Sequence, residues 1–295
     1  MAGRKRPSHN TETSGDTQPP GGVFLREISR RRRAIPDPEA FPFSVPVIRT
    51  LEPLSLDSRV TFFVGENGSG KSTLLEAIAS AARLPAVGSA DLDADATLAS
   101  QRELAEALRL VWSRRTTRGF FLRAEDFFGF AKRISALRAE LVQRIADLDV
   151  EYADRSAYAK GLARGPALTS LHELERRYGV DLAANSHGQS FLRLFQSRFV
   201  PGGLYLLDEP EAPLSPQSQL ALMAMMQDMV AQDAQFVVAT HSPILLAYPD
   251  ARIYSFDVAP AQRVPYDELE HVRLTRDFLN APERYLRALR GTGSG

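Results

Sequence analysis

The sequence contains no cysteine among its 295 residues. This excludes disulfide bridges, thiolate metal sites and cysteine nucleophiles, and it is consistent with a reducing compartment. Net charge is also lacking, because 36 basic side chains balance 36 acidic ones. The whole molecule therefore exerts no long-range attraction toward nucleic acid or an anionic membrane, although a local charged patch stays open. No uninterrupted apolar run approaches the length of a membrane span.

The first 22 residues are polar and rich in Pro, Gly, Ser and Thr, which predicts a disordered tail. Arg4, Lys5 and Arg6 are not followed by an apolar segment, so the pattern is not that of a secretory signal. We therefore expect a soluble protein in the cytoplasm. Hydrophobic residues make up 44% of the chain, which is ordinary for a globular domain. We expect a single domain over residues 23–290 and a frayed end over residues 291–295.

Residues 60–82 carry the most specific pattern in the chain. An apolar strand pattern, a glycine-rich loop and a helical pattern follow one another, and residues 65–72 fit G-x-x-x-x-G-K-[ST]. Glycines let backbone N–H groups turn toward phosphate oxygens, and a helix start adds its positive dipole end. Lys71 is expected to reach the β- and γ-phosphates, and Ser72 to ligate Mg²⁺. The alternative is a glycine-rich turn without a ligand, but motif and context together favour a nucleoside triphosphate site.

A second motif, LYLLDEP, covers residues 204–210. An apolar strand there delivers two adjacent carboxylates at its C-terminal end, which is what Mg-assisted phosphoryl transfer uses beside a phosphate loop. We assign Asp208 to Mg²⁺, directly or through water, and Glu209 to the polarisation of the attacking water. Either acid alone is an ordinary residue at a strand end, and the phosphate loop gives the pair its meaning.

Two weaker signals complete the set. Residues 186–190, SHGQS, precede a helical run, and a small polar residue with glycine at a helix start forms an anion site. His241 follows the strand pattern FVVA, where a lone histidine is usually structural. The fixed order of the four motifs favours the functional interpretation of both.

The coarse pattern alternates strands and helices. Strand patterns occupy residues 23–28, 45–48, 60–64, 119–123, 203–207, 236–239, 251–256 and 263–266. Helical patterns occupy residues 72–82, 101–111, 191–199, 216–232, 243–246 and 275–289. Residues 124–126 are expected to form a turn, and residues 127–178 to be mostly helical with a break at 161–166. We interpret residues 127–185 as a helical insert.

With these motifs in their order, the chain resembles the ATPases of the ABC superfamily. It is similar to a compact bacterial group of AAA-family ATPases, related to the heads of SMC and RecF-type proteins but without their long coiled coil. The resemblance covers residues 23–290 and is carried by GENGSGKST, NSHGQS, LYLLDEPEAPLSP and ATHSP. It implies an α/β P-loop NTPase fold with a mixed sheet and a helical insert, which binds ATP and Mg²⁺ and hydrolyses ATP.

The resemblance also implies that two heads close on two ATP molecules as an ATP-dependent homodimer. Lys71, Glu209 and His241 would be catalytic, with His241 contacting the γ-phosphate, and Ser72 and Asp208 would hold the metal. Residues 212–215 would match the loop that crosses the dimer seam. The residues expected to contact ATP are Gly65, Glu66, Asn67, Gly68, Ser69, Gly70, Lys71, Ser72, Thr73 and, from the second chain, Ser186, Gly188 and Gln189.

The sequence departs from the transporter-type pattern at several points. His187 replaces a glycine of the signature, and Pro213 stiffens the following loop. No glutamine follows residues 119–123, so Glu125 is the nearest candidate for a contact to Mg²⁺ or water. Phe41 or Phe43 would stack on adenine, or else belong to the core.

Two other functions stay open. An ATP-gated module with slow turnover would signal to a DNA or protein partner, and the basic run 30–33 or the helical insert would meet that partner. The basic run is otherwise a solvated loop. The ATPase subunit of a membrane transporter would need a permease partner and lacks the usual coupling glutamine.

Overall fold

The computed structural model describes residues 22–31, 37–87, 99–178 and 187–291. The predicted disordered tail, residues 1–22, lies outside this set except for its last residue, and so does most of the predicted frayed end. The central element is a sheet in the order β5-β6-β7-β3-β8-β9. Its strands are β3 (Val60–Val64), β5 (Gly119–Arg123), β6 (Leu204–Asp208), β7 (Gln235–Ala239), β8 (Arg252–Ser255) and β9 (Gln262–Arg263).

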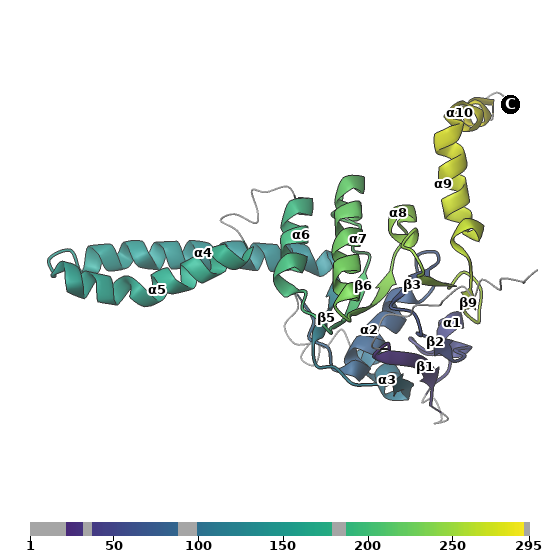
Figure 1. Ribbon diagram of the computed structural model, residues 1–295, viewed down its shortest axis with the longest axis horizontal. Helices are drawn as coiled ribbons and strands as arrows, with labels where there is room; N and C mark the ends of the chain where they lie inside the picture. Colours follow the sequence, from purple (N-terminus) through teal and green to yellow (C-terminus); the bar gives the residue numbers. More distant parts are fainter. Residues whose placement is uncertain (1–21, 32–36, 88–98, 179–186, 292–295) are drawn as a thin grey trace, which may run out of the picture.

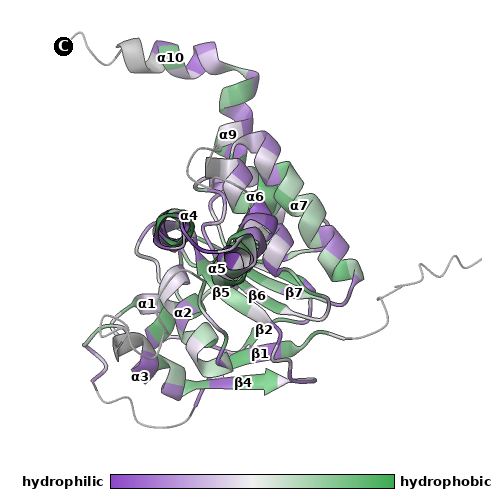
Figure 2. Cartoon of the chain, turned by 90° about the vertical axis from the view of Figure 1, so that its left-hand side faces the viewer, coloured by the Kyte–Doolittle hydropathy of each residue, from purple (hydrophilic) through white to green (hydrophobic). Residues whose placement is uncertain are grey.

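The sheet is mixed, as predicted. Strands β5, β6, β7, β3 and β8 run parallel to their neighbours, and β9 pairs antiparallel with β8 at the edge. All residues of β3, β6 and β7 are buried, because helices cover both faces of a parallel sheet. The continuous apolar strands are visible in the hydropathy colouring of β5, β6 and β7 (Figure 2).

Neighbouring residues on one strand belong to different cores, since side chains alternate across a strand. Phe62 packs in the core formed with α6 (His187–Arg198), α7 (Pro216–Ala231) and α8 (Pro243–Leu246). Phe63 packs in the core formed with α2 (Lys71–Ala82) and the N-terminal strands. The carboxyl ends of β3, β6 and β7 therefore lie at one edge, between two layers of helices (Figure 1).

A second, antiparallel sheet was not predicted. It consists of β2 (Leu54–Ser55), β1 (Leu25–Arg30) and β4 (Leu108–Trp112), in the order β2-β1-β4. The prediction of one helix over residues 101–111 was therefore wrong in its second half: α3 (Ala99–Ala107) ends there, and pairing with β1 overrides the helical spacing. The Gln235 amide joins the two sheets, because it accepts the Phe24 and Leu25 N–H groups at 2.9 Å each and donates to Leu25 O at 2.8 Å.

Two further local predictions were wrong. Residues 45–48 form no strand; a short helix, α1 (Pro46–Arg49), begins there because Pro46 at its first position presets a helical φ. Residues 124–126 form no turn, since α4 (Ala124–Glu151) begins directly after β5. Glu125 and Asp126 lie in the first turn of α4, where acidic side chains interact favourably with the helix dipole.

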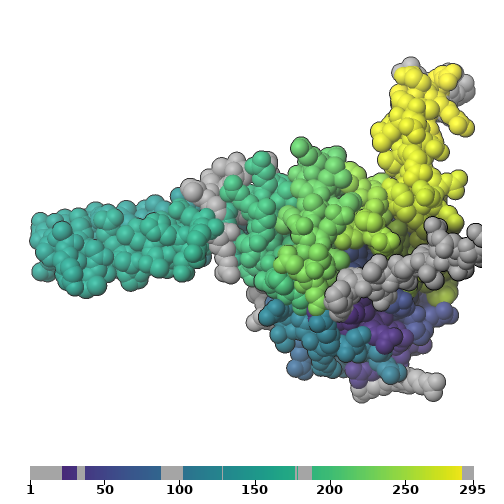
Figure 3. Space-filling model, viewed as in Figure 1, coloured from purple at the N-terminus to yellow at the C-terminus, as the bar shows by residue number. Residues whose placement is uncertain are grey.

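Helices α4 and α5 (Ala157–Tyr178) pack against each other as an arm that leaves the body (Figures 1 and 3). The predicted break at 161–166 was wrong, because the chain reverses at residues 152–156 instead. Pro166 lies inside α5 on an exposed position, where water can reach the carbonyl group that a proline leaves without its partner. Of the helices described, none combines the length and apolar character that crossing a membrane requires.

The C-terminal segment, predicted as one helix over residues 275–289, forms two. A 3₁₀ turn, η2 (Tyr266–Glu268), leads into α9 (Glu270–Asn280), and α10 (Pro282–Gly291) follows after Ala281. The residue before a proline avoids the helical region, so Pro282 ends α9 and starts α10. Both helices extend away from the sheet in Figure 1, and the same segment projects from the body in the space-filling view of Figure 3.

Candidate functional site

The glycine-rich loop joins β3 to α2 as predicted. Gly65, Gly68 and Gly70 have φ values of 147°, 83° and 101°, which favour glycine. At Gly70, which caps α2, a Cβ would also lie 2.7 Å from Val45 Cγ1. The loop therefore depends on glycine for its shape, and it ends at the amino terminus of a 12-residue helix.

Lys71 is buried at the base of this loop. Its Nζ donates to the Gly65 and Glu66 carbonyl oxygens, at 2.6 Å and 2.9 Å. Burial lowers the pKa of Lys71, while the carboxylates of Glu209 and Asp208 oppose that shift. The ammonium group thus lies between the loop and the acidic end of β6.

Ser72 and Asp208 meet although they are far apart in sequence. The Ser72 hydroxyl donates to Asp208 Oδ1 at 3.0 Å. Asp208 is only 7% exposed, and burial raises its pKa to about 7, whereas the bond from Ser72 opposes this shift. A divalent cation would offset this buried negative charge.

The donor set fits Mg²⁺. Hydroxyl and carboxylate oxygens are the ligands that Mg²⁺ takes, and it usually binds one or two protein groups together with substrate phosphates. In the described part of the chain no three His, Cys, Asp or Glu side chains cluster as a self-sufficient metal site. The predicted ligands Ser72 and Asp208 would therefore hold Mg²⁺ only together with a phosphate-bearing ligand.

Glu209 and His241 lie side by side at the ends of β6 and β7. His241 Nε2 is 3.7 Å from Glu209 Oε1, and both side chains are partly exposed, at 39% and 45%. Glu209 has a φ of 49°, an uncommon conformation for a residue with a Cβ that is often found at functional sites. The His241 Nε2 atom is buried without a hydrogen-bond partner among the described residues.

Glu211 is a site residue that sequence reasoning missed. Its Oε1 accepts the backbone N–H of His241 at 2.7 Å, and burial raises its pKa. Gln219 fixes the next residue, because Gln219 Oε1 accepts the Ser242 hydroxyl at 2.6 Å. Two residues from the segment after β6 thus hold the histidine-bearing turn. The only sequence signal for the role of Glu211 was the acidic segment DEPE, residues 208–211.

The C-terminal part of the chain also reaches the site. Asp257, which follows β8, accepts the Glu66 N–H of the glycine-rich loop at 2.7 Å. His271, in the first turn of α9, has its pKa lowered first by burial and then by His241, whereas Asp257 opposes this shift. Leu269 and Val272 anchor this end of α9 in the core that contains α8. No sequence signal pointed to either residue.

The predicted signature segment is described only from His187 onward. Ser186 is outside the described residues. Gly188 is the second residue of α6, and the atoms nearest to a Cβ at this position belong to Pro213, Ser218 and Leu214, at 3.1–3.7 Å. Gln189 is exposed. Gly188 therefore borders the loop after β6 and the start of α7.

The remaining candidates differ in their exposure and contacts. The Glu125 side chain is 78% exposed and lies 3.8 Å from Arg123 NH1. Arg123 itself is the register partner of Asp208 and pairs with Glu76 of α2. Phe43 belongs to the core, whereas Phe41 is 52% exposed.

Of the basic run 30–33, the described members serve the fold. Arg30 NH1 donates to Arg49 O at 2.9 Å, and Arg31 Nε donates to Leu108 O at 2.8 Å. The other two arginines lie outside the described residues.

Sequence comparison identifies the family. A family model described as "AAA domain, putative AbiEii toxin, Type IV TA system" matches residues 100–247, just over half of the chain. The chain belongs to this AAA-domain family. A second model, described as "AAA domain", matches residues 44–83, which include the glycine-rich loop of this AAA domain. The predicted resemblance to AAA-family ATPases is confirmed.

Solved structures similar to the AAA domain include SMC heads and ABC cassettes. An SMC head from Pyrococcus furiosus, with an extended coiled coil and bound to the C-terminal domain of ScpA, is 12% identical; the match covers 90% of this chain and 99% of that chain, with a TM-score of 0.42. The SMC head of Thermotoga maritima is 14% identical, with 82% and 99% covered and a TM-score of 0.39. An ABC-transporter cassette in its ADP conformation is 17% identical, with 82% and 91% covered and a TM-score of 0.41. No curated protein matches the chain.

Proposed function

We propose that this AAA domain binds ATP with Mg²⁺ and hydrolyses it to ADP and phosphate. The observation that carries the proposal is the convergence of Lys71, the Ser72–Asp208 pair at 3.0 Å and the Glu209–His241 pair at 3.7 Å. These groups come from two strand ends and a helix start, and they match the parts that phosphoryl transfer requires.

Each residue has a role that its position supports. The N–H groups of residues 65–73 surround the phosphates, and the Lys71 ammonium neutralises the oxygens of the β- and γ-phosphates. Ser72 and Asp208 hold Mg²⁺, which when bound neutralises charge that develops on the phosphate oxygens. Glu209 accepts a hydrogen bond from the attacking water, and His241 donates to the γ-phosphate or orients that water.

We further propose that hydrolysis accompanies closure of two heads around ATP. The position of Gly188 supports this proposal, because Gly188 borders the loop after β6. The signature would also be a second anion site, which has no use within one chain but does have a use across a two-fold interface. Ser186, Gly188 and Gln189 of one copy would then meet the γ-phosphate bound by the other.

Phosphate release with Mg-ATP tests the hydrolysis directly. Wild-type protein should release phosphate well above a Lys71→Ala control, because the alanine variant lacks the phosphate-binding ammonium. If both proteins released phosphate at the same rate, the isolated chain would not be an ATPase.

The solution mass of Glu209→Gln, measured by light scattering, tests the closure. We expect a monomer without nucleotide and a dimer with Mg-ATP, and Ser186→Arg in the same background should abolish the dimer. A mass unchanged by bound ATP would rule out closure between two copies.

A slow, ATP-gated interaction module is the second candidate. The observation in its favour is the projecting α4–α5 arm, which exposes Val150, Tyr158 and Leu162 at 78%, 81% and 70%. Exposed apolar side chains grouped near the tip of an arm are typical of a surface that meets a protein. ATP binding without phosphate release above the Lys71→Ala control would favour this candidate over the first.

A further inference from the structure

A hollow of about 360 Å³ lies at the amino ends of β5, β6 and β7. It is lined in part by Arg114, Arg115 and Arg118 from the segment before β5, and by Asp233 from the segment before β7. The glycine-rich loop follows the carboxyl end of β3 in the same parallel sheet. The hollow is therefore separate from the candidate ATP site.

Guanidinium groups outnumber carboxylates around this hollow. Asp233 forms ion pairs with both Arg59 and Arg114, so one carboxylate balances the charge of only one of these two guanidinium groups. Burial lowers the pKa of Arg59, and repulsion from Arg114 adds to this shift. Arg115 and Arg118 form no ion pair with any described residue. Positive charge is thus left uncompensated beside a concave surface, and an anion would relieve it.

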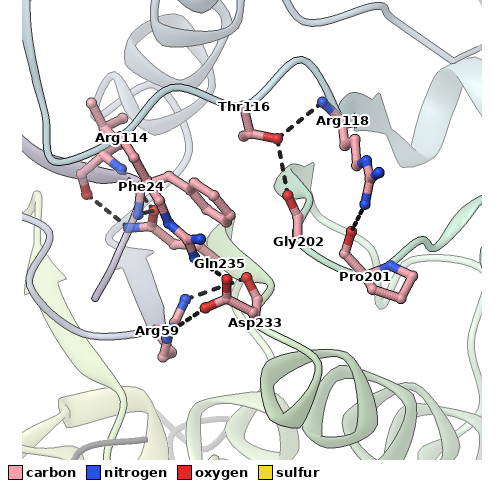
Figure 4. A network of polar contacts seen from close by, with 10 residues as sticks. Phe24, Arg59, Arg114, Thr116, Arg118, Pro201, Gly202, Asp233 and Gln235 are labelled. Atoms are coloured by element: carbon pink, nitrogen blue, oxygen red, sulfur yellow. Dashed lines mark hydrogen bonds and ion pairs between the residues drawn. The ribbon is translucent and has the colours of Figure 1, made fainter. Parts of the chain in front are cut away.

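Two of the guanidinium groups, those of Arg114 and Arg118, are held in place before any ligand arrives (Figure 4). Arg118 NH1 donates to Pro201 O at 3.1 Å, and Arg118 N donates to Thr116 Oγ1 at 3.1 Å. The Thr116 hydroxyl in turn donates to Gly202 O at 2.9 Å. The Arg114 guanidinium lies over the Phe24 ring, 4.3 Å from its centroid. Positioned side chains lose little entropy on binding, which favours a ligand site over a flexible charged surface.

We propose that this hollow binds the phosphate group of a ligand. Arginine presents a planar fork of donors that matches phosphate oxygens, and two guanidinium groups that form no ion pair with a described residue, those of Arg115 and Arg118, border the space. The volume is within the range of sites for small organic ligands. Such a ligand would contact the segment that leads into β7, the strand whose other end carries His241.

Calorimetric titration with inorganic pyrophosphate tests the hollow. The full chain carries Lys71→Ala, so that the glycine-rich loop does not dominate the signal. We expect one pyrophosphate per chain, and the additional pair Arg115→Ala and Arg118→Ala should weaken binding by about tenfold or more. The pair Arg273→Ala and Arg284→Ala, exposed on α9 and α10, is the matched control and should leave binding unchanged.

Failure of the Lys71→Ala chain to bind pyrophosphate, or an equal loss in the control pair, would overturn the proposal. Because Arg118 also bonds to Pro201, Arg115→Glu alone is a second variant that keeps this contact. It should abolish measurable binding without changing the thermal midpoint. Binding unaffected by this charge reversal would also contradict the assignment.

Competition identifies the source of the phosphate. Displacement of pyrophosphate by AMP but not by a short single-stranded DNA would assign a small organic phosphate. Displacement by the DNA, with a steep loss of affinity as salt is raised, would assign a nucleic-acid backbone. If neither competed, the phosphate-ligand proposal would be wrong.

Discussion

At the carboxyl end of the central sheet one lysine lies among carboxylates, whereas at the amino end one aspartate lies among guanidinium groups. Burial lowers the pKa of Lys71, and the carboxylates of Glu209, Asp208, Asp257 and Glu211 oppose that shift. Asp233 pairs with Arg59 and Arg114, and Arg115 and Arg118 lie nearby. The same strands thus carry an excess of negative charge at one end and an excess of positive charge at the other.

The two ends differ in how the chain supplies these charges. The acidic end is built mainly from short motifs directly after strands, each with its own sequence pattern. The basic end combines residues 59, 114 and 233, which are separated by up to 174 positions along the chain. An excess of acid beside a lysine suits a cation together with a phosphate ligand, whereas an excess of arginine suits an anion alone. The following predictions test this contrast.

Glu209→Gln should have the largest effect. Because a carboxamide cannot act as a general base, phosphate release should fall by about 10²–10⁴-fold, while ATP affinity stays within about threefold. Phosphate-release kinetics and nucleotide binding measure the two quantities. Glu106→Gln, exposed on α3, is the control. A phosphate-release rate equal to that of the wild type would show that Glu209 is not the general base.

Gln235→Leu should be the most destabilising change at the amino end. It leaves the Phe24 and Leu25 N–H groups and two carbonyl oxygens without the Gln235 amide. Buried unsatisfied groups of this kind should lower the free energy of unfolding by about 2–4 kcal/mol. Urea denaturation measures it, with the exposed Gln227→Leu on α7 as control. Similar stability in both variants would show that the hydrogen bonds of the Gln235 amide between the two sheets are dispensable.

Glu211→Ala should affect catalysis more than binding. The His241 backbone loses its acceptor, and a misplaced catalytic group should slow phosphate release by about 10- to 100-fold with ATP affinity nearly unchanged. Glu211→Gln keeps an acceptor oxygen and should restore most of the rate. If the glutamine variant were as slow as the alanine variant, hydrogen bonding to His241 would not be the role of Glu211.

Asp233→Asn should disturb the basic end alone. Asparagine tolerates the positive φ of 72° at this position, so the change removes charge without backbone strain. Loss of the pairs with Arg59 and Arg114 should lower the free energy of unfolding by about 1–2 kcal/mol, because these groups are partly exposed. Phosphate release per folded molecule should be unchanged. A slower rate would show that the two ends are coupled.

His271→Gln should have the smallest effect, visible only in the pH dependence of stability. The folded chain lowers the pKa of His271 below its ordinary 6.5, so the unfolded chain binds more protons in that window. Stability is therefore lost as pH falls through 6.5, and the variant should reduce this loss by less than about 1 kcal/mol. Urea unfolding at neutral and mildly acidic pH measures it.

His172→Gln, exposed on α5, is the matched control for this experiment. An identical pH dependence in wild type and His271→Gln would show that His271 titrates as if it were free in water.

The candidate ATP site was predictable because its parts follow strands whose carboxyl ends share one edge. The strand, loop and helix over residues 60–82 and the acids at 208 and 209 carry patterns that a single segment specifies. The structure then brought Ser72 to 3.0 Å from Asp208, and His241 to 3.7 Å from Glu209. Their catalytic roles remain predictions for the experiments above.

Local pattern failed where a neighbouring element decided the outcome. Leu108 and Val111 have helical spacing, yet they form a strand because β1 offers a partner. Pro166 predicted a break, but its exposed position let α5 continue.

The sequence alone was enough to predict the glycine-rich loop, the adjacent acids after β6 and the AAA-domain family, because each depends on contiguous residues with a fixed spacing. Only the tertiary structure decided that Glu211 holds the His241 backbone, that Asp257 holds the glycine-rich loop, and that Asp233 lies between two arginines. These contacts join residues 30–191 positions apart, and the register of the sheet sets them. No contiguous motif encodes contacts across such separations, because they form only after the strands have paired in the register that burial of a sheet face specifies.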